Sequence, residues 1–267
     1  MVGTYCRRRP HAAVHRPRKR WRERLLAGRR GRLRTISRST HSAKRGLRLR
    51  IGIIGAGRIG GNCATQLAKG GHEVKLSGRD PSKLEPLAQE IGDAASVGTP
   101  AEAAEFGEVV VVAVPWDGWD DAVSAAGPLD GKIVIDTTNQ YGSTEMPVDG
   151  ETGASFHAAR ADGARYTKSF NTLTSTFQAE AAFRPEAKRV VQWVCGDDDE
   201  AKQVVMGLIA DAGYVPVDIG GNADAAVMEA PRRPGAVYGD EYRLPEAEKV
   251  ARAVRAGREI PPTPSYE

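Results

Sequence analysis

The feature that most constrains the fold is a glycine-rich turn between an apolar run and a helix-like segment. The apolar run covers residues 51–54, and residues 62–69 read as a helix. In a G-x-G-x-x-G turn the first glycine permits a tight bend, the second lets a ligand approach the backbone, and the third lets strand and helix pack closely. The N–H groups at the helix start then face an anion. We therefore predict a dinucleotide-binding turn whose six residues all contact the ligand: Gly55, Ala56, Gly57, Arg58, Ile59 and Gly60.

Strand-like and helix-like segments alternate along most of the chain. We expect strands at residues 50–54, 73–76, 109–114, 132–136, 165–170, 189–195 and 215–218. We expect helices at residues 62–69, 81–91, 117–126, 151–160, 174–183, 198–212 and 246–255. The unbroken apolar run at 109–114 is typical of a strand that is buried on both faces. This order predicts an α/β fold: a doubly wound, mainly parallel Rossmann-type sheet with a short irregular C-terminal segment.

The end of the second expected strand indicates which dinucleotide binds. An NAD site places an acidic residue there to hold the ribose 2′-hydroxyl. The strand instead ends in Ser77, Gly78 and Arg79, with no acidic residue before Asp80. The Arg79 fork and the Ser77 hydroxyl suit a 2′-phosphate, and nearby Lys83 and Arg58 add positive charge. We predict NADP(H) rather than NAD, with a solvated basic loop as the alternative interpretation.

Charge divides the chain into unlike parts. Residues 1–50 contain 18 Lys and Arg against one acidic residue, whereas the remainder contains 20 basic and 33 acidic residues. We predict a basic, disordered leader at 1–49, an NADP-binding domain at 50–224, and a segment at 225–267 that completes the acceptor or dimer surface. Three interpretations of the leader stay open: an organellar transit peptide, a basic arm that binds nucleic acid, or a start site assigned too early in a GC-rich gene. The third fits its Arg-over-Lys bias best, and the acidic body does not suggest a nucleic-acid partner.

No stretch is apolar enough for a secretory signal or a membrane span, so we expect a cytoplasmic protein without a membrane partner. The three cysteines, Cys6, Cys63 and Cys195, are far apart and indicate reduced thiols, with Cys195 in the core. We predict no metal site, because the body contains only two histidines and the acidic residues 197–200 suit a helix start. Trp116 and Trp119 suit either stacking on a flavin-like ring or packing on a surface helix.

Residues 50–221 resemble the NADP reductases that use 8-hydroxy-5-deazaflavin, coenzyme F-420. The resemblance rests on the glycine turn, residues 77–79, residues 114–117 and, most specifically, residues 194–206. It implies a single Rossmann domain with a small C-terminal piece, usually a homodimer, that passes a hydride between nicotinamide and deazaflavin. Two departures are visible: Gly78 stands where the family has its phosphate-binding serine, and residues 229–238 replace a long apolar helix.

The resemblance also implies roles for individual residues. The three turn glycines would meet the pyrophosphate, and Arg79 and Lys83 the 2′-phosphate. The remaining positions lie near the cofactor or its ring: Val114, Pro115, Asn171 and Thr172. From their place after an expected strand, Thr137 and Asn139 are further candidates for contact with the nicotinamide ribose.

Three functions stay open. The first is hydride transfer between NADP(H) and a deazaflavin or related flavin-type acceptor, which needs positioning more than a catalytic acid. The second is a non-catalytic NADP-binding sensor. The third is NADPH-dependent reduction of a small carbonyl or imine, which needs a proton donor such as Lys168 or Tyr141. Lys168 is otherwise expected to be a strand-end lysine that reaches solvent.

Overall fold

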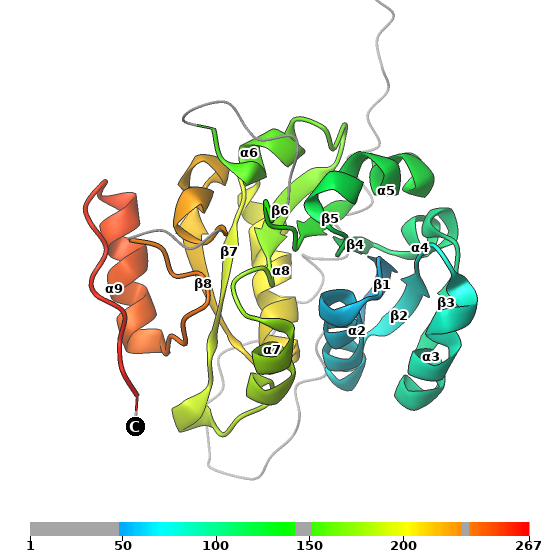
Figure 1. Ribbon diagram of the computed structural model, residues 1–267, viewed down its shortest axis with the longest axis horizontal. Helices are drawn as coiled ribbons and strands as arrows, with labels where there is room; N and C mark the ends of the chain where they lie inside the picture. Colours follow the sequence, from blue (N-terminus) through cyan, green and yellow to red (C-terminus); the bar gives the residue numbers. More distant parts are fainter. Residues whose placement is uncertain (1–47, 142–150, 231–234, 267) are drawn as a thin grey trace, which may run out of the picture. The chain divides into compact units, whose positions relative to one another are not determined.

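The computed structural model describes residues 48–141, 151–230 and 235–266. These residues belong to one compact unit of the chain, and the predicted leader up to residue 47 lies outside them. The described residues form a single eight-stranded sheet (Figure 1). Its strands are β1 (Arg50–Ile54), β2 (Glu73–Ser77), β3 (Ala95–Gly98), β4 (Val109–Val112), β5 (Ile133–Asp136), β6 (Arg165–Ser169), β7 (Val191–Cys195) and β8 (Val215–Gly220).

The sheet has the order β3-β2-β1-β4-β5-β6-β7-β8. Strands β1 to β6 are parallel to one another, whereas β7 pairs antiparallel with β6 and carries β8 parallel to itself. The chain leaves β1 toward β2 and β3 and returns on its other side at β4. The carboxyl ends of β1 and β4 therefore flank the point where ligands of doubly wound sheets bind. The predicted mainly parallel, Rossmann-type α/β fold is confirmed.

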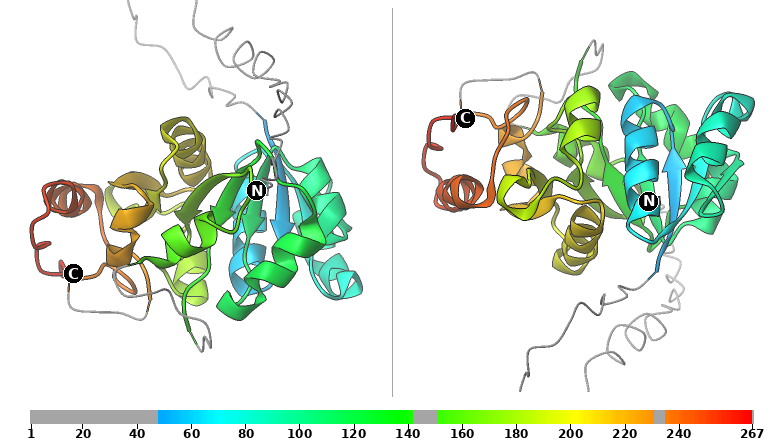
Figure 2. Two further views of the ribbon diagram at one scale, coloured as in Figure 1. Left: turned by 90° about the horizontal axis from the view of Figure 1, so that it is seen from above. Right: turned by 90° about the horizontal axis from the view of Figure 1, so that it is seen from below.

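Helices cover both faces of the sheet (Figure 2). One layer packs its buried side chains into the core that contains Ile51 and Ile53: α2 (Arg58–Lys69), α3 (Glu85–Ile91), α7 (Ser175–Ala181) and α8 (Asp199–Asp211). The other packs into the core that contains Ile54 and Val112: α4 (Pro100–Phe106), α5 (Trp119–Ala126), α6 (Gly153–Ala158) and α9 (Leu244–Arg255). Four short 3₁₀ segments connect them: η2 (Pro81–Leu84), η3 (Trp116–Gly118), η4 (Glu186–Lys188) and η5 (Asn222–Val227).

Successive residues of the central strands alternate between the two cores, as the pleat of a strand requires. In β4, Val109 and Val111 belong to one core, and Val110 and Val112 to the other. All four side chains are at most 1% exposed. This double burial explains why the strand is an unbroken apolar run, and it ends at Val112 rather than at residue 114 as predicted.

Among the described residues, one strand and one α-helix were not predicted. Strand β3 contains Ala95, Ser96 and Gly98, residues of low strand propensity, and it lies at an edge of the sheet. Helix α4 does have a signal in the sequence, because Thr99 and Glu102 form a reciprocal capping box and Pro100 occupies the first turn. The C-terminal region also has more structure than expected, namely η5 and an α9 that begins two residues before the predicted start. No helix of the described residues is long and apolar enough to cross a bilayer.

Replacing Gly52 in β1 tests how tightly the sheet holds α4. A Cβ at Gly52 would overlap the carbonyl oxygen of Ala103 in α4, and backbone cannot rotate away as a side chain can. We expect Gly52→Ala to lower the free energy of unfolding by about 1–3 kcal/mol. The matched control is Gly207→Ala in α8, where a Cβ meets nothing within 4 Å. This substitution should raise the free energy of unfolding by about 0.5–1 kcal/mol. Urea unfolding compares them, and a Gly52→Ala midpoint equal to wild type would contradict the close contact.

Candidate functional site

The predicted site residues gather at one edge of the sheet. The glycine turn follows β1, Arg79 follows β2, and Val114 and Pro115 follow β4. Thr137 and Asn139 follow β5, while Asn171 and Thr172 follow β6. Because β1 to β6 are parallel, all of these positions lie at the carboxyl ends of the strands. This is the edge at which open α/β sheets bind their ligands.

The three turn glycines differ in what the protein itself requires of them. Gly55 has a φ of 88°, and a Cβ there would lie 2.6 Å from the Ala113 carbonyl oxygen. A Cβ at Gly60 would overlap the carbonyl oxygen of Gly55. Gly57 is exposed, has no positive φ, and a Cβ there would meet nothing within 4 Å. Packing explains the first and third glycines, whereas Gly57 leaves open space that a ligand can use.

The start of α2 is suited to an anion. Gly57 is its N-cap residue, so no side chain caps the first turn, and that turn contains no acidic residue. The backbone before it is held by the N–H groups of Gly55 and Ala56, which both donate to the Ser77 carbonyl oxygen at 3.0 Å. An uncapped helix start presents unpaired N–H groups and the positive end of the helix dipole. A phosphate approaching over Gly57 would meet both.

The basic tip after β2 differs in part from its prediction. Ser77 is 0% exposed, and its hydroxyl donates to the Ile53 carbonyl oxygen at 2.9 Å. It therefore joins β2 to β1 and does not face the tip, because its position in the strand turns it into the sheet. Lys83 is exposed but pairs with Asp80 at 3.3 Å. Arg79 and Arg58 are exposed and have no ion pair with any described residue, so these two guanidinium groups are the ones at the tip that are not engaged by an acidic side chain.

An asparagine pair joins the ends of β5 and β6. The Asn139 amide donates to the Asn171 carbonyl oxygen at 2.8 Å, and the Asn171 amide donates to Asn139 Oδ1 at 3.2 Å. Both also hold the chain after η5: Asn171 donates to the Met228 carbonyl oxygen at 2.8 Å, and Asn139 accepts from the Ala230 N–H at 3.1 Å. Asn171 Oδ1 is buried without a partner among the described residues. Phe170, which precedes Asn171, has a φ of 56°, a conformation that a residue with a large side chain adopts only where the surrounding structure constrains the backbone.

Thr137 and Thr172 are less available. Thr137 is buried and its hydroxyl donates to the Val112 carbonyl oxygen at 3.3 Å. The Thr172 hydroxyl, also buried, donates to Gln192 at 3.4 Å. Their side chains thus bond within the protein, whereas Val114 is half-buried and Pro115 exposed. Contact of these two threonines with a cofactor would have to use their backbone or follow a rearrangement.

Beneath this edge lies a cluster of charged and polar groups that sequence reasoning did not foresee. Asp136 Oδ2 accepts from Lys168 Nζ at 2.9 Å and from the Tyr166 hydroxyl at 2.6 Å, and lies 3.1 Å from His157 Nδ1. Glu229 lies 4.0 Å from Lys168 Nζ and accepts from the two N–H groups that begin α6, at 3.0 and 2.8 Å. The cluster thereby joins β5, β6, α6 and the segment after η5.

Three groups of this cluster, Asp136, Lys168 and Tyr166, hold one another in defined protonation states. Burial opposes the ionisation of Asp136, yet Lys168, His157 and Tyr166 lower its pKa below the usual value. Burial likewise opposes the charged form of Lys168, yet Asp136 and Glu229 raise its pKa. Burial and Asp136 raise the pKa of Tyr166, which therefore remains a hydroxyl donor. At neutral pH the cluster contains an ionised Lys168–Asp136 pair.

Lys168 does not reach solvent, so that expectation is wrong. Its side chain is 0% exposed and points to Asp136, its register partner on the neighbouring strand. A side chain so enclosed cannot meet a substrate in this arrangement. The signal available in the sequence was that Asp136 and Lys168 end two neighbouring strands, and that Tyr166 shares the Lys168 face two residues earlier.

The tryptophans after β4 also differ from both expectations. Trp116 and Trp119 are 3% and 1% exposed, and each stacks on the His157 ring, with centroids 4.0 and 4.1 Å apart. They neither lie at the surface nor offer a face to a flavin-like ring. His157 comes from α6, which the sequence placed correctly but could not orient. The indoles instead fix the imidazole beside Asp136.

Two further expectations are confirmed. Asp198 caps α8 by accepting from the Ala201 N–H at 3.0 Å, and it receives a two-point contact from Arg165 at 2.6 and 2.8 Å. Cys195 is a buried free thiol of the core, and burial raises its pKa. Both residues are thus structural.

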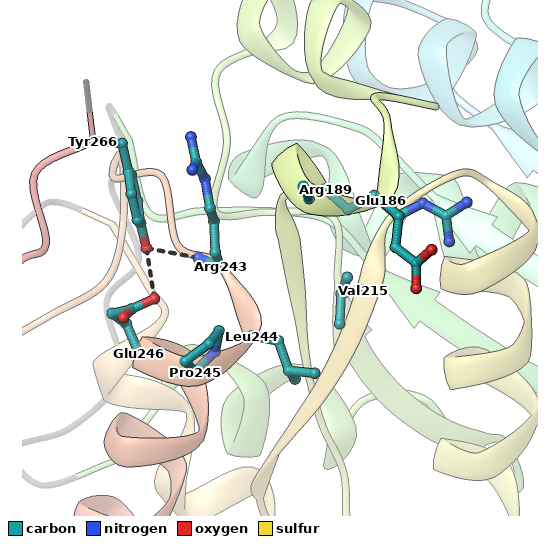
Figure 3. A pocket seen from close by; sticks show the side chains of 9 residues that line it. Glu186, Arg189, Val215, Arg243, Leu244, Pro245, Glu246 and Tyr266 are labelled. Carbon is teal, nitrogen blue, oxygen red and sulfur yellow. Dashed lines mark hydrogen bonds between the residues drawn. The ribbon is translucent and has the colours of Figure 1, made fainter.

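A separate hollow of about 520 Å³ opens between η4, the start of β8 and the start of α9 (Figure 3). It contains none of the predicted site residues. The Tyr266 hydroxyl accepts from the Arg243 N–H at 2.9 Å and donates to Glu246 at 3.2 Å, and the Arg243 guanidinium lies over the Tyr266 ring at 4.1 Å. Tyr266, Arg243 and Glu246 of its wall thus bond to one another.

Replacing Asp136 tests the buried cluster. Asp136→Asn leaves the Lys168 ammonium buried beside Glu229 alone, and breaking a buried pair from one side costs about 3–5 kcal/mol. Urea unfolding at pH 7 should show this loss, with Asp93→Asn, at an exposed carboxylate, as the unchanged control.

The same pair predicts a pH dependence. Because the folded-state pKa of Asp136 is depressed, its contribution is complete above the unfolded value of about 3.9 and is lost as the pH falls below it. The difference in the free energy of unfolding between wild type and Asp136→Asn should therefore become smaller below about pH 4. If this difference were under about 0.5 kcal/mol at pH 7, the pair would not stabilise the fold.

Comparison with known proteins agrees with this arrangement. Residues 50–140 match the family model described as NADP oxidoreductase, coenzyme F420-dependent. Metalloreductase STEAP3 of Rattus norvegicus is 30% identical over 181 residues, 68% of this chain and 36% of that protein. Metalloreductase STEAP2 of Mus musculus is 23% identical over 67% of this chain and 35% of that protein. The chain thus spans about a third of the length of the curated relatives that it matches.

Two solved structures share the fold. The hypothetical protein SMa0349 of Sinorhizobium meliloti superposes with a TM-score of 0.64 and 24% identity, over 74% of this chain and 96% of that one. A putative F420-dependent NADP-reductase from Arthrobacter sp. FB24 superposes with a TM-score of 0.57 and 26% identity, over 67% and 87%. In its fold and over residues 50–140, the chain is therefore similar to NADP-dependent oxidoreductases.

Proposed function

We propose that this chain binds NADP(H) at the carboxyl edge of its sheet and exchanges a hydride between the nicotinamide and a flat acceptor of the deazaflavin or flavin type. The observation that carries the proposal is the open space at Gly57. Packing requires Gly55 and Gly60 but leaves Gly57 without any neighbour for a Cβ. A diphosphate that approaches the backbone above the uncapped start of α2 would explain why this position is a glycine.

Arg79 supports NADP(H) over NAD(H). It is exposed at the end of β2, where a doubly wound sheet holds the ribose of the adenosine half. A guanidinium there pairs with a phosphate in two-point fashion, while the position has no carboxylate for a free 2′-hydroxyl. The next residue, Asp80, does carry a carboxylate, but this carboxylate accepts a hydrogen bond from the Ser82 hydroxyl at 2.6 Å and forms an ion pair with Lys83.

The buried lysine favours hydride exchange between rings over reduction of a carbonyl or imine. Reduction of a small carbonyl or imine draws on a positioned proton donor. Lys168 is enclosed and paired with Asp136, and His157 is enclosed between two indoles. Tyr141 remains the one donor candidate of that alternative with an exposed side chain. Ring-to-ring transfer needs mainly proximity and orientation, which the joined ends of β5 and β6 supply.

The comparisons support a deazaflavin or flavin-type acceptor. The matching family model and the Arthrobacter structure both name coenzyme F420 beside NADP. The metalloreductases are named for a different final acceptor, and this chain matches only about a third of their length. We therefore take the ring acceptor as the proposal, and the homodimer implied by the family resemblance as a prediction for size-exclusion chromatography.

An acceptor assay tests this function. Purified protein is mixed with NADPH and, separately, with oxidised 8-hydroxy-5-deazaflavin, FMN or FAD, and loss of the acceptor's visible absorbance is followed. We expect turnover with at least one ring and none without protein. NADPH binding without turnover on any of the three would overturn hydride transfer and leave the sensor interpretation.

Substituting the turn glycines tests the diphosphate cradle. Gly57→Ala should not lower the urea midpoint, because a Cβ meets no protein atom, yet it should weaken NADPH binding at least about tenfold, or 1.4 kcal/mol. Gly60→Ala should instead lower the midpoint, since its Cβ overlaps Gly55. Fluorescence titration gives the NADPH affinity. Unchanged affinity in Gly57→Ala would place the diphosphate elsewhere.

Replacing Arg79 tests the 2′-phosphate. Losing its two-point contact costs about 1.5–3 kcal/mol, so Arg79→Ala should weaken NADPH binding roughly tenfold or more and barely affect NADH. Lys69→Ala, an exposed cation at the far end of α2, is the control for net charge. An equal loss for both dinucleotides would show that Arg79 does not read the phosphate.

A further inference from the structure

Two tyrosines from distant parts of the chain meet at the carboxyl edge. Tyr141 follows β5 and Tyr238 follows η5. Their rings lie edge to face, with centroids 5.9 Å apart and planes at 63°. Tyr141 is 54% exposed, and among the described residues Leu244, at 42%, is the other large apolar side chain that is exposed. Tyr238 is half-buried, and its burial and its hydrogen bond with Tyr141 raise its pKa.

Backbone hydrogen bonds attach this pair to the proposed nicotinamide site. The Tyr141 N–H donates to the Asn139 carbonyl oxygen at 2.9 Å, and the Gly239 N–H, next to Tyr238, donates to the Thr172 carbonyl oxygen at 2.8 Å. Asn139 belongs to the asparagine pair that joins β5 to β6. The two rings are therefore held by the ends of those strands, and do not depend on a free loop for their position.

The exposed ring and the buried orphan acceptor both point to a ligand. Removing an aromatic side chain from water stabilises a complex, and an oriented ring contact adds to that stabilisation. Asn171 Oδ1 is buried without a partner among the described residues, and a buried acceptor that lacks a donor destabilises the structure until a donor reaches it. Asn171 bonds directly to Asn139, the residue that holds Tyr141. A flat ring that covers Tyr141 and donates an N–H to Asn171 Oδ1, once that buried oxygen opens to it, would answer both features.

We propose that Tyr141 and Tyr238 form the aromatic wall of the acceptor site, and that they select a flat heteroaromatic ring that carries an N–H donor, as flavins and deazaflavins do. This inference rests on the proposed function and names the residues that bind its second substrate. NADPH loses a hydride and becomes NADP⁺, while the acceptor ring gains that hydride and one proton from solvent. The tyrosines bind and orient the ring and take no part in the proton balance.

Fluorescence quenching tests the wall without any turnover. FMN and oxidised 8-hydroxy-5-deazaflavin are titrated with protein in the absence of NADPH. Stacking on the pair should quench ring fluorescence, and Tyr141→Ala or Tyr238→Ala should weaken the binding at least tenfold. Tyr141→Phe and Tyr238→Phe retain the rings and should stay within about threefold of wild type. Leu244→Ala, at the other exposed apolar side chain, should change nothing.

The variants also separate acceptor binding from cofactor binding. In each tyrosine variant the NADPH affinity should remain within twofold of wild type, and steady-state assays should show a raised KM for the acceptor. A urea midpoint equal to wild type excludes misfolding, and if an alanine variant does unfold, the comparison passes to Tyr141→Leu, which keeps apolar bulk but has no ring. Tyr141→Leu should then weaken ring binding as alanine does.

The outcomes distinguish this inference from the proposed function. Turnover of NADPH with a ring acceptor that is unaffected by either alanine substitution would overturn the tyrosine wall and leave the function standing. Wild-type quenching that depends on the tyrosines, together with no turnover, would support the wall and overturn hydride transfer. Absence of any quenching by wild-type protein, with either ring, would overturn the wall directly.

Discussion

The ligand-facing edge depends on a close backbone contact between the end of β1 and the start of α2. Gly60 lies so near the Gly55 carbonyl oxygen that a side chain at Gly60 would push the helix from the strand, and a side chain at Gly55 would collide with the Ala113 carbonyl oxygen after β4. This contact brings the uncapped end of the helix to the carboxyl edge of the sheet, with only Gly57 between its first N–H groups and open space. Each other feature of the site is arranged around that point: Arg79 on one side, and the ends of β4, β5 and β6 on the other.

A second constraint acts on the far half of the edge. The ionised Asp136–Lys168 pair lies wholly inside the protein, together with Tyr166, His157 and Glu229. Such a pair tolerates little movement, because separation would leave a buried charge without its partner. Through Glu229 and the asparagine pair, it fixes the chain after η5 against β5 and β6. The charges therefore serve to hold the edge in shape, and the chemistry of the site comes from what that edge positions.

The sequence was a good guide wherever local chemistry decides structure. The glycine turn, the capped helix α8 and the doubly buried strand β4 depend on contacts of nearby residues, and they could be predicted. Strand β3 could not, because an edge strand of four residues carries little apolar pattern. The antiparallel direction of β7 could not be predicted either, since the segment between β6 and β7 is long enough to bring β7 beside β6 in either a parallel or an antiparallel direction.

Tertiary contacts account for the wrong side-chain assignments. The direction of Ser77 was not evident from its place at a strand end, and its hydroxyl turns out to join two strands. Trp116 and Trp119 both stack on His157, which lies about 40 residues later in the chain and which their own neighbourhood in the sequence does not indicate. Lys168 was expected in solvent as a strand-end lysine, and its partner Asp136 lies 32 residues earlier in the chain. Such pairings become visible only when neighbouring strands are placed in register.

Calorimetric titration of the full chain with NADPH and with NADH tests the central claim most directly, because it asks whether the glycine turn and Arg79 together form a cofactor site. We expect a single binding event with NADPH and an affinity for NADH at least tenfold lower, the difference that a 2′-phosphate contact supplies. Absence of binding heat with NADPH at several temperatures would contradict the account. Equal affinity for the two dinucleotides would retain the turn but remove Arg79 from the site.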